Sequence, residues 1–248
     1  MKLRLLCNLA AAGLAMSVAA SPAFAGKEKG SDWQGGHSCE NGKKCKGQGH
    51  DNHGNGNGHG HNHDDDATQP DPFTIERPGN DRGAFIAQIG EGNSASVSQS
   101  ANTQYGRVGQ SGIENLAQVD QSGTGAHYGV TGQLGWYNEL TLTQDGSAAQ
   151  VALLKQVGSG NEMSILQDGD TDGNGVAALQ LGRDNEMSLT QSGENNQAFL
   201  VQNGTGNEMT AIQHGDDNQL VWTQSGDRLS HATVEQTGSQ AMQITQSR

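Results

Sequence analysis

A glutamine that recurs at nearly every eleventh position over the last two thirds of the chain constrains the fold more than any other feature. Of the 14 steps between these glutamines, nine span eleven positions, and the others span ten, twelve or thirteen. A unit this short cannot bury a core alone, so the repeat predicts a solenoid in which each unit packs on its neighbours. The repeated residues are Gln88, Gln99, Gln110, Gln121, Gln133, Gln144, Gln156, Gln167, Gln180, Gln191, Gln202, Gln213, Gln224, Gln236 and Gln246.

The residues around each glutamine keep a fixed phase. The positions four and two residues before it are small or apolar in every unit except for Thr131, and Gly follows two residues after it in 13 of the 15 units. Spacings of two place these side chains and the glutamine on one face of a strand, and the glycine supplies a turn. Nine units also have Asn six residues before the glutamine: Asn93, Asn115, Asn138, Asn161, Asn174, Asn185, Asn196, Asn207 and Asn218.

These units predict an all-β fold, a parallel β-solenoid of stacked strand–turn–strand coils. Two units form one coil, so two parallel sheets face each other about 10 Å apart, and successive coils stack about 4.8 Å apart as in cross-β amyloid. Strands are expected near 83–88, 94–99, 105–110 and 116–121, and onward at each glutamine. Stacked Gln and Asn side chains can satisfy one another as amide ladders, which explains why inward amides recur.

The chain before the repeat divides into two parts. Residues 1–25 have a positive start, an apolar stretch and an Ala23-Phe24-Ala25 cleavage motif, which predicts a secretory signal peptide and a mature chain beginning at Gly26. Residues 26–81 are rich in Gly, Asn and His and have no hydrophobic period, so they are expected to be disordered. The repeat region is expected to span residues 82–248.

Two groups in the polar segment could carry chemistry. His59, His61 and His63 are followed by three Asp residues and offer imidazole and carboxylate ligands to a divalent metal. The alternative is a soluble low-complexity tract whose histidines are incidental. Cys39 and Cys45 predict a small disulfide loop in an oxidising compartment, and a zinc site with two flanking histidines is the alternative.

Charge and composition exclude several function classes. The net charge of −13 disfavours nucleic acid or an anionic membrane as a partner, and no apolar run in the mature chain is long enough to span a membrane. The histidines of the repeat region fall at different phases, with His127 replacing a corner Asn, so no catalytic set recurs and no cofactor is expected. The stretch 168–173 opens like an EF-hand loop, but Leu179 stands where the ligand Glu is required, so a solvated turn is favoured.

The repeat resembles that of the curlin family, the subunits of bacterial curli, which follows S/N-x5-Q-x4-N-x5-Q with Gly in the turns. Asn185, Gln191, Asn196 and Gln202 reproduce this pattern. The resemblance implies a non-enzymatic, secreted subunit of extracellular amyloid fibres that serve as biofilm matrix and in surface adhesion. It also implies, as partners, other copies of the chain, a nucleator or other curlin-type subunit, an outer-membrane secretion pore and periplasmic chaperones. A major, fibre-forming subunit is favoured; a minor nucleator and a monomeric metal-binding β-solenoid at the cell surface are the alternatives.

The last repeat predicts how copies would join. Met242 to Gln246 still follows the repeat pattern, with neither Pro nor a bulge to protect the edge of the final strand. We therefore expect open ends that stack head-to-tail without closing, which generates a fibre.

Overall fold

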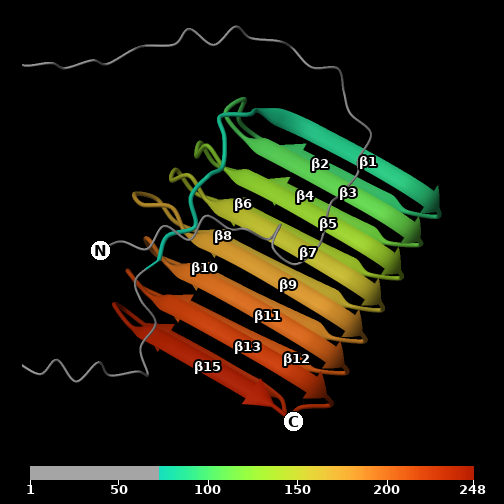
Figure 1. Ribbon diagram of the computed structural model, residues 1–248. Helices are drawn as coiled ribbons and strands as arrows, with labels where there is room; N and C mark the ends of the chain where they lie inside the picture. The colour runs from blue at the N-terminus through green and yellow to red at the C-terminus, as the bar shows by residue number, and fades with distance from the viewer. Residues whose placement is uncertain (1–72) are drawn as a thin grey trace, which may run out of the picture. The chain divides into compact units, whose positions relative to one another are not determined.

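A computed structural model describes residues 73–248, which form 15 β-strands and no helix (Figure 1). The first eight strands are β1 (Gly83–Glu91), β2 (Ser94–Gln99), β3 (Tyr105–Ile113), β4 (Leu116–Gln121), β5 (Tyr128–Trp136), β6 (Glu139–Asp145), β7 (Val151–Ser159) and β8 (Glu162–Asp168). The remaining seven are β9 (Gly175–Arg183), β10 (Glu186–Ser192), β11 (Gln197–Thr205), β12 (Glu208–His214), β13 (Gln219–Asp227), β14 (Ala232–Thr237) and β15 (Ala241–Ser247). No helix in this part of the chain could therefore cross a membrane.

The strands alternate between two parallel sheets. The odd-numbered strands form an eight-stranded sheet in sequence order, and the even-numbered strands form a seven-stranded sheet. We call these the odd sheet and the even sheet. One odd and one even strand make a coil, and each strand pairs in register with the strand one coil away. This architecture confirms the predicted parallel β-solenoid.

The unequal spacing of the glutamines does not disturb the register. The longest step runs from Gln167 to Gln180, yet Gln167 pairs with Gln191 in the even sheet and Gln180 pairs with Gln156 in the odd sheet. The extra residues lie in the connections, because the strands must keep their period of two to hold one face inward. Three of the four longer steps fall in even-to-odd connections, and the fourth, from Gln224 to Gln236, falls in the odd-to-even connection between β13 and β14.

The core lies between the two sheets and runs along the solenoid. Its side chains are the inward apolar residues of each strand, and Leu140, Leu142, Leu200 and Leu220 have no exposed surface. At the first coil the same inward position is open, because Ile86 is 48% exposed. Full burial of an inward apolar side chain therefore requires a coil on both sides.

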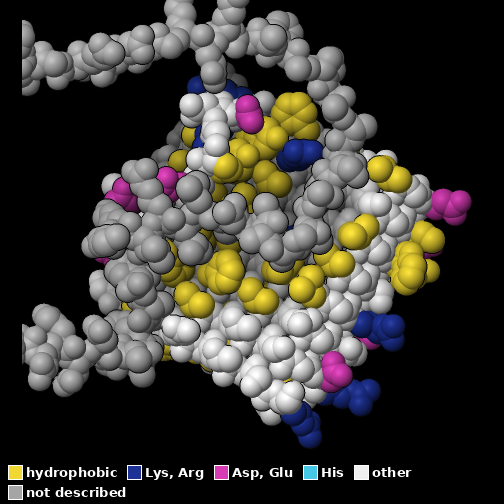
Figure 2. Space-filling view, in the orientation of Figure 1, with side chains coloured by type: hydrophobic (Ala, Val, Ile, Leu, Met, Phe, Trp, Pro, Cys, Tyr) yellow, Lys and Arg dark blue, Asp and Glu magenta, His cyan; other side chains and the backbone are white. Residues whose placement is uncertain are grey.

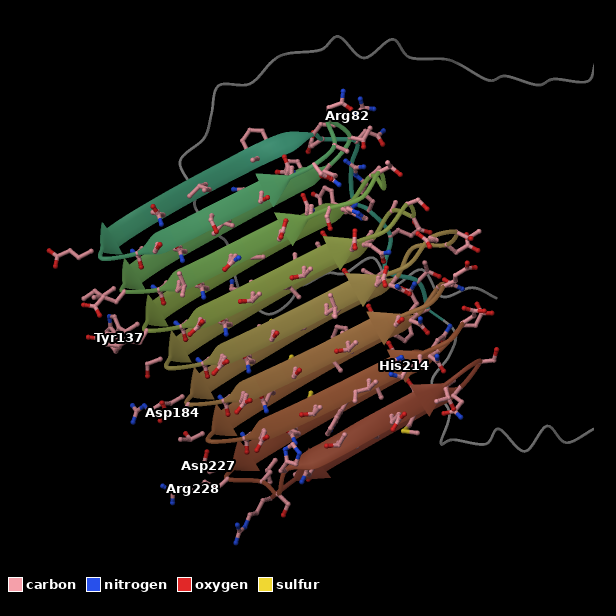
Figure 3. All side chains as sticks on the ribbon, turned by 180° about the vertical axis from the view of Figure 1, so that it is seen from behind. Arg82, Tyr137, Asp184, His214, Asp227 and Arg228 are labelled. Atoms are coloured by element: carbon pink, nitrogen blue, oxygen red, sulfur yellow. The ribbon has the colours of Figure 1, made fainter. Side chains whose placement is uncertain are left out.

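Left-handed backbone is required both near the ends of the odd strands and in the connections that follow them. Gly135 has φ +123°, and a Cβ atom there would overlap the carbonyl oxygen of Gly158 in the next coil, so only glycine fits. Tyr137, Asp184 and Arg228 take positive φ without being glycine, and all three lie in odd-to-even connections along one edge of the solenoid (Figure 3).

Residues 73–82, which we call the strap, precede the first strand and lie on the outer face of the odd sheet. The strap has no regular secondary structure, yet Phe73 and Ile75 are only 5% and 4% exposed. They pack with outward residues of the odd strands, among them Tyr105, Tyr128 and Val151. Apolar side chains gather on this face (Figure 2), which gives an otherwise polar segment a surface on which to order.

The strap is fixed by polar contacts as well as apolar ones. The backbone N–H groups of Phe73 and Ile75 donate to the side-chain oxygens of Gln219 and Gln197, at 3.4 and 2.9 Å. Arg77 lies 5.3 Å from the ring centroid of Tyr128 and donates to a carbonyl in the connection before β5. The strap therefore runs along the odd sheet from β13 back to β1.

Candidate assembly site: amide ladders and open ends

The repeated glutamines form two continuous ladders, one in each sheet. Each side-chain Nε2 donates to the Oε1 of the glutamine one coil further on, and all 13 of these hydrogen bonds measure 2.7 to 2.9 Å. In the odd sheet the ladder runs from Gln88 to Gln246, and in the even sheet it runs from Gln99 to Gln236. Every donor points toward the C-terminal end, so each ladder has a direction.

Every ladder glutamine except Gln88 also donates to a backbone carbonyl outside its own sheet. Gln156, for example, donates to the carbonyl oxygens of Glu139 and Asn161 at 2.8 and 3.0 Å while it serves the ladder. The side chain is fully buried. A buried amide normally costs free energy, but here both of its polar atoms have partners, so that cost is avoided.

The asparagines form a ladder of opposite direction in the odd-to-even connections. Asn115 donates to Asn93, and four further Asn–Asn bonds follow it, with lengths of 2.9 to 3.1 Å. Each member also donates to a glycine carbonyl near the end of the odd strand in the next coil, as Asn138 does to Gly158 of β7 at 3.1 Å. This column contains six of the nine predicted asparagines: Asn93, Asn115, Asn138, Asn161, Asn185 and Asn207.

The even-to-odd connections have a corner column of mixed composition. It contains the other three predicted asparagines, Asn174, Asn196 and Asn218, together with Gln104, His127 and Gln150, and all six are buried. Gln150 accepts a 2.8 Å bond from the backbone of Asn174 and so replaces an asparagine. The repeat pattern did not identify Gln104 or Gln150 as ladder residues; their position six residues before an inward glutamine is the signal that could have done so.

His127 occupies this column as a neutral corner residue. Its Nε2 lies 2.7 Å from the carbonyl oxygen of Ser122, and the backbone N–H of Gln150 donates to its Nδ1 at 3.3 Å. Because Nδ1 accepts a hydrogen bond, the proton of the neutral ring is on Nε2. Burial lowers the pKa of His127, and contacts with the Ser122 carbonyl and Asp145 offset this only in part.

The outer face of the even sheet carries a row of four carboxylates in register: Glu139, Glu162, Glu186 and Glu208. Partial burial and the two neighbouring carboxylates raise the pKa of Glu162. His231 lies at one end of the row, 2.9 Å from Glu208. The row is a repulsive element within a structure that is otherwise stabilised by stacking.

The two ends of the solenoid differ from its middle. The edges of β1 and β2 are unpaired at one end, and the edges of β14 and β15 at the other. Within residues 73–248 no group donates to the side-chain oxygens of Gln88 and Gln99, whereas Gln236 and Gln246 donate only to backbone carbonyls. One end therefore presents acceptors and the other presents donors.

The comparison with family models decides what this repeat is. The Curlin associated repeat model matches residues 90–123 and again residues 182–215. The chain contains curlin-associated repeats. Each matched stretch covers three glutamine units, and the ladder geometry is continuous between and beyond them, so the curlin-type unit extends through 15 strands. No curated protein and no solved structure matches the chain.

The curlin repeat family is structural, and this agrees with the prediction of a non-enzymatic role. The feature that recurs through residues 73–248 is the stacking of β-strands and amides. One His–hydroxyl contact occurs, between His231 Nε2 and Thr233 Oγ1 at 3.1 Å, and it lies exposed on the outer face of the even sheet beside Glu208. The segment that opens like an EF-hand loop is an even-to-odd connection, in which the Asp170 carboxylate accepts from Ser147 at 3.3 Å.

His59, His61, His63, Cys39 and Cys45 lie outside the residues that the structure describes, as do residues 1–25. Their roles stay predictions.

Proposed function

We propose that this chain is a secreted structural subunit that self-assembles head-to-tail into extracellular amyloid fibres of the curli type. The curlin repeats and their directional ladders support this function. The complementary ends carry the argument: the donors of Gln236 and Gln246 at one end match the free acceptors of Gln88 and Gln99 at the other. Stacking of a second copy would extend the ladders, both sheets and the core at once.

The proposed function also implies a route of export and a set of partner proteins. Residues 1–25 would direct export to the periplasm, and residues 26–81 would direct passage through an outer-membrane curli pore with the help of periplasmic chaperones. A nucleator or other curlin-type subunit would begin the fibre, and the fibre would contribute to biofilm matrix and adhesion. The 15-strand solenoid favours the major, fibre-forming role, because a long regular stack is suited to extending a polymer.

Assembly can be tested on the purified mature chain. Thioflavin fluorescence should rise with a lag, and aligned fibres should diffract at about 4.8 Å along the axis and at about 10 Å across it. Replacing an inward residue of the last strand, Ile244→Asp, should stop growth, because each added copy would bury an unpaired charge.

The outward substitution Thr245→Asp in the same strand is the matched control and should still permit fibres. A parent chain that stays monomeric under all conditions would refute the proposed function, and so would an Ile244→Asp variant that grows at the parent's rate.

A further inference from the structure

The number of strands in the solenoid is odd, and this restricts how two copies can stack. Within residues 73–248 the odd sheet has eight strands and the even sheet has seven, so the first and last described strands, β1 and β15, belong to the same sheet. In strand-by-strand order, each new strand is added to the sheet opposite the preceding one. The strand that follows β15 therefore belongs beside β14, in the even sheet.

Two arrangements of the next copy are conceivable. Without rotation, β1 of the next copy would pair with β15, and its β2 would lie two coil spacings beyond β14, about 9.6 Å away instead of about 4.8 Å. That arrangement leaves a one-strand gap in the even sheet at every junction, with the backbone edges of β14 and β2 unpaired. The Gln236 side chain could not reach Gln99 across this gap, so the even ladder would be broken once per copy.

Rotation by half a turn removes the gap. We propose that successive copies are related by a half-turn about the fibre axis. This inference rests on the proposed head-to-tail polymer and specifies the symmetry of that polymer. In this arrangement β1 of one copy pairs with β14 of the preceding copy, and β2 pairs with β15. The odd sheet of each copy continues as the even sheet of the next, and every strand edge within the fibre is paired.

The residues at the ends agree with the half-turn. Alignment of Gln246 with Gln99 pairs the inward residues Ile244 and Met242 with Val97 and Ala95, as the core requires. The outward residues are then Thr245 against Ser98 and Gln243 against Ser96, which are polar on both strands and exposed.

The outward residues of β1 meet polar residues in either arrangement. Phe85 and Ile89, which are 52% and 65% exposed in the single copy, would lie beside Gln243 and Ser247 in the unrotated stack and beside Thr233 and Thr237 after a half-turn. The half-turn is therefore favoured by the paired strand edges and by the match between β15 and β2. Both sheets use the same inward pattern of two apolar residues and a glutamine, so exchange of the sheets at each junction disturbs neither the core nor the glutamine ladders.

The half-turn has a consequence for the fibre surface. Each copy would advance the fibre by about 7.5 coils, or about 36 Å, and the straps would alternate between opposite sides. The structural repeat would then be two copies, about 72 Å long.

Engineered disulfides separate the two arrangements. In the mature chain with Cys39→Ser and Cys45→Ser, we would introduce Ala87→Cys together with either Glu235→Cys or Thr245→Cys. Residues 87, 235 and 245 are outward and exposed, and Ala87 lies at the opposite end from the other two, so no bond can form within one copy. In-register neighbours on adjacent parallel strands lie about 4.8 Å apart, which a disulfide can bridge.

The half-turn predicts covalent ladders on a non-reducing gel from oxidised fibres of A87C/E235C, and none from A87C/T245C. The opposite result, crosslinking in both variants, or crosslinking in neither when both form fibres, would overturn the half-turn. Thioflavin fluorescence and electron microscopy report fibre formation separately, so a parent chain that forms no fibres would count against the proposed function instead.

Discussion

At the scale of single residues, the inward glutamines are buried amides, which would destabilise the fold if they had no partners but here link successive coils. An isolated buried glutamine would leave up to four hydrogen-bonding positions without partners. In this chain each glutamine has the same neighbours because each coil repeats the last. The side chains of Gln133, Gln156 and Gln180 are linked in series by bonds of 2.9 Å. The stability of one amide therefore depends on the two coils that flank it.

Loss of one ladder amide should be costly. Gln156→Leu preserves the approximate volume but removes the partners of Gln133 and Gln180 and of two backbone carbonyls. Each buried polar group left unsatisfied costs about 1–3 kcal/mol, so we expect a total loss of about 3 kcal/mol or more. Urea unfolding of the monomer measures this loss. Gln118→Leu, at an exposed outward position of β4, is the control and should change stability by less than about 0.5 kcal/mol.

His127 makes part of the stability depend on pH. Its folded-state pKa is lowered by burial, so below its ordinary value of 6.5 the unfolded chain binds more protons than the folded one. Folding stability from this residue is thus fully present above that pH and falls as the pH decreases. His127→Gln, which copies Gln104 and Gln150 in the same column, should flatten the profile between pH 7 and pH 5. Equal pH profiles for parent and variant in urea unfolding would contradict this account.

At the scale of elements, strands of the two sheets share their inward face and differ in their outward face. The outward residues of the middle odd strands are mainly apolar, such as Val130, Leu153 and Phe199, and the strap packs against them. The outward residues of the even strands include the carboxylate row. Since one strand in two belongs to each sheet, this difference recurs once per coil rather than once per glutamine unit.

The strap packs where the odd sheet has no side chain, at Gly175. A Cβ atom on Gly175 would lie 2.9 Å from Cβ of Ile75 and would overlap Oε1 of Gln197, both of which hold the strap. Gly175→Ala should therefore displace the strap while leaving the coils intact. Trypsin cleavage after Arg82 should become several-fold faster, because that bond joins the strap to β1.

Gly109→Ala is the control for this experiment, because its Cβ would meet only one carbonyl oxygen, at 3.9 Å, on the same sheet. Cleavage at the parent's rate in Gly175→Ala would show that the strap does not depend on this contact.

At the scale of the whole molecule, the sequence predicts the strands and the residues that face the core, but it does not predict what the outward residues contact. The phase of the glutamines determines strand, turn and register, because a slip of one residue would turn Leu142 and its equivalents outward. The strap could not be predicted from that period: it lies outside the repeat, and its contacts are with outward residues that look irregular when every unit is compared with the next. Comparison of alternate units separates the two sheets and reveals the apolar stretch on which Phe73 and Ile75 pack.

The charge of the solenoid gives a prediction for the intact fibre. Residues 73–248 contain seven Lys and Arg residues and 19 Asp and Glu residues, a net charge of −12, so stacking brings strongly like-charged bodies together. Salt shortens the range of this repulsion to about 10 Å at 0.1 M, whereas the ladders and the core act at contact and are little affected. Seeded elongation should therefore accelerate several-fold between about 10 and about 300 mM NaCl.

Measurement of elongation with preformed seeds removes any contribution from nucleation. The Glu162→Gln variant lacks a central carboxylate of the outer row, and at low salt it should elongate faster than the parent, with the difference shrinking as salt is added. Elongation at a rate independent of salt would show that charge repulsion does not limit the approach of whole copies. Slower growth at higher salt would show that attraction between opposite charges, rather than the amide ladders, guides the ends together.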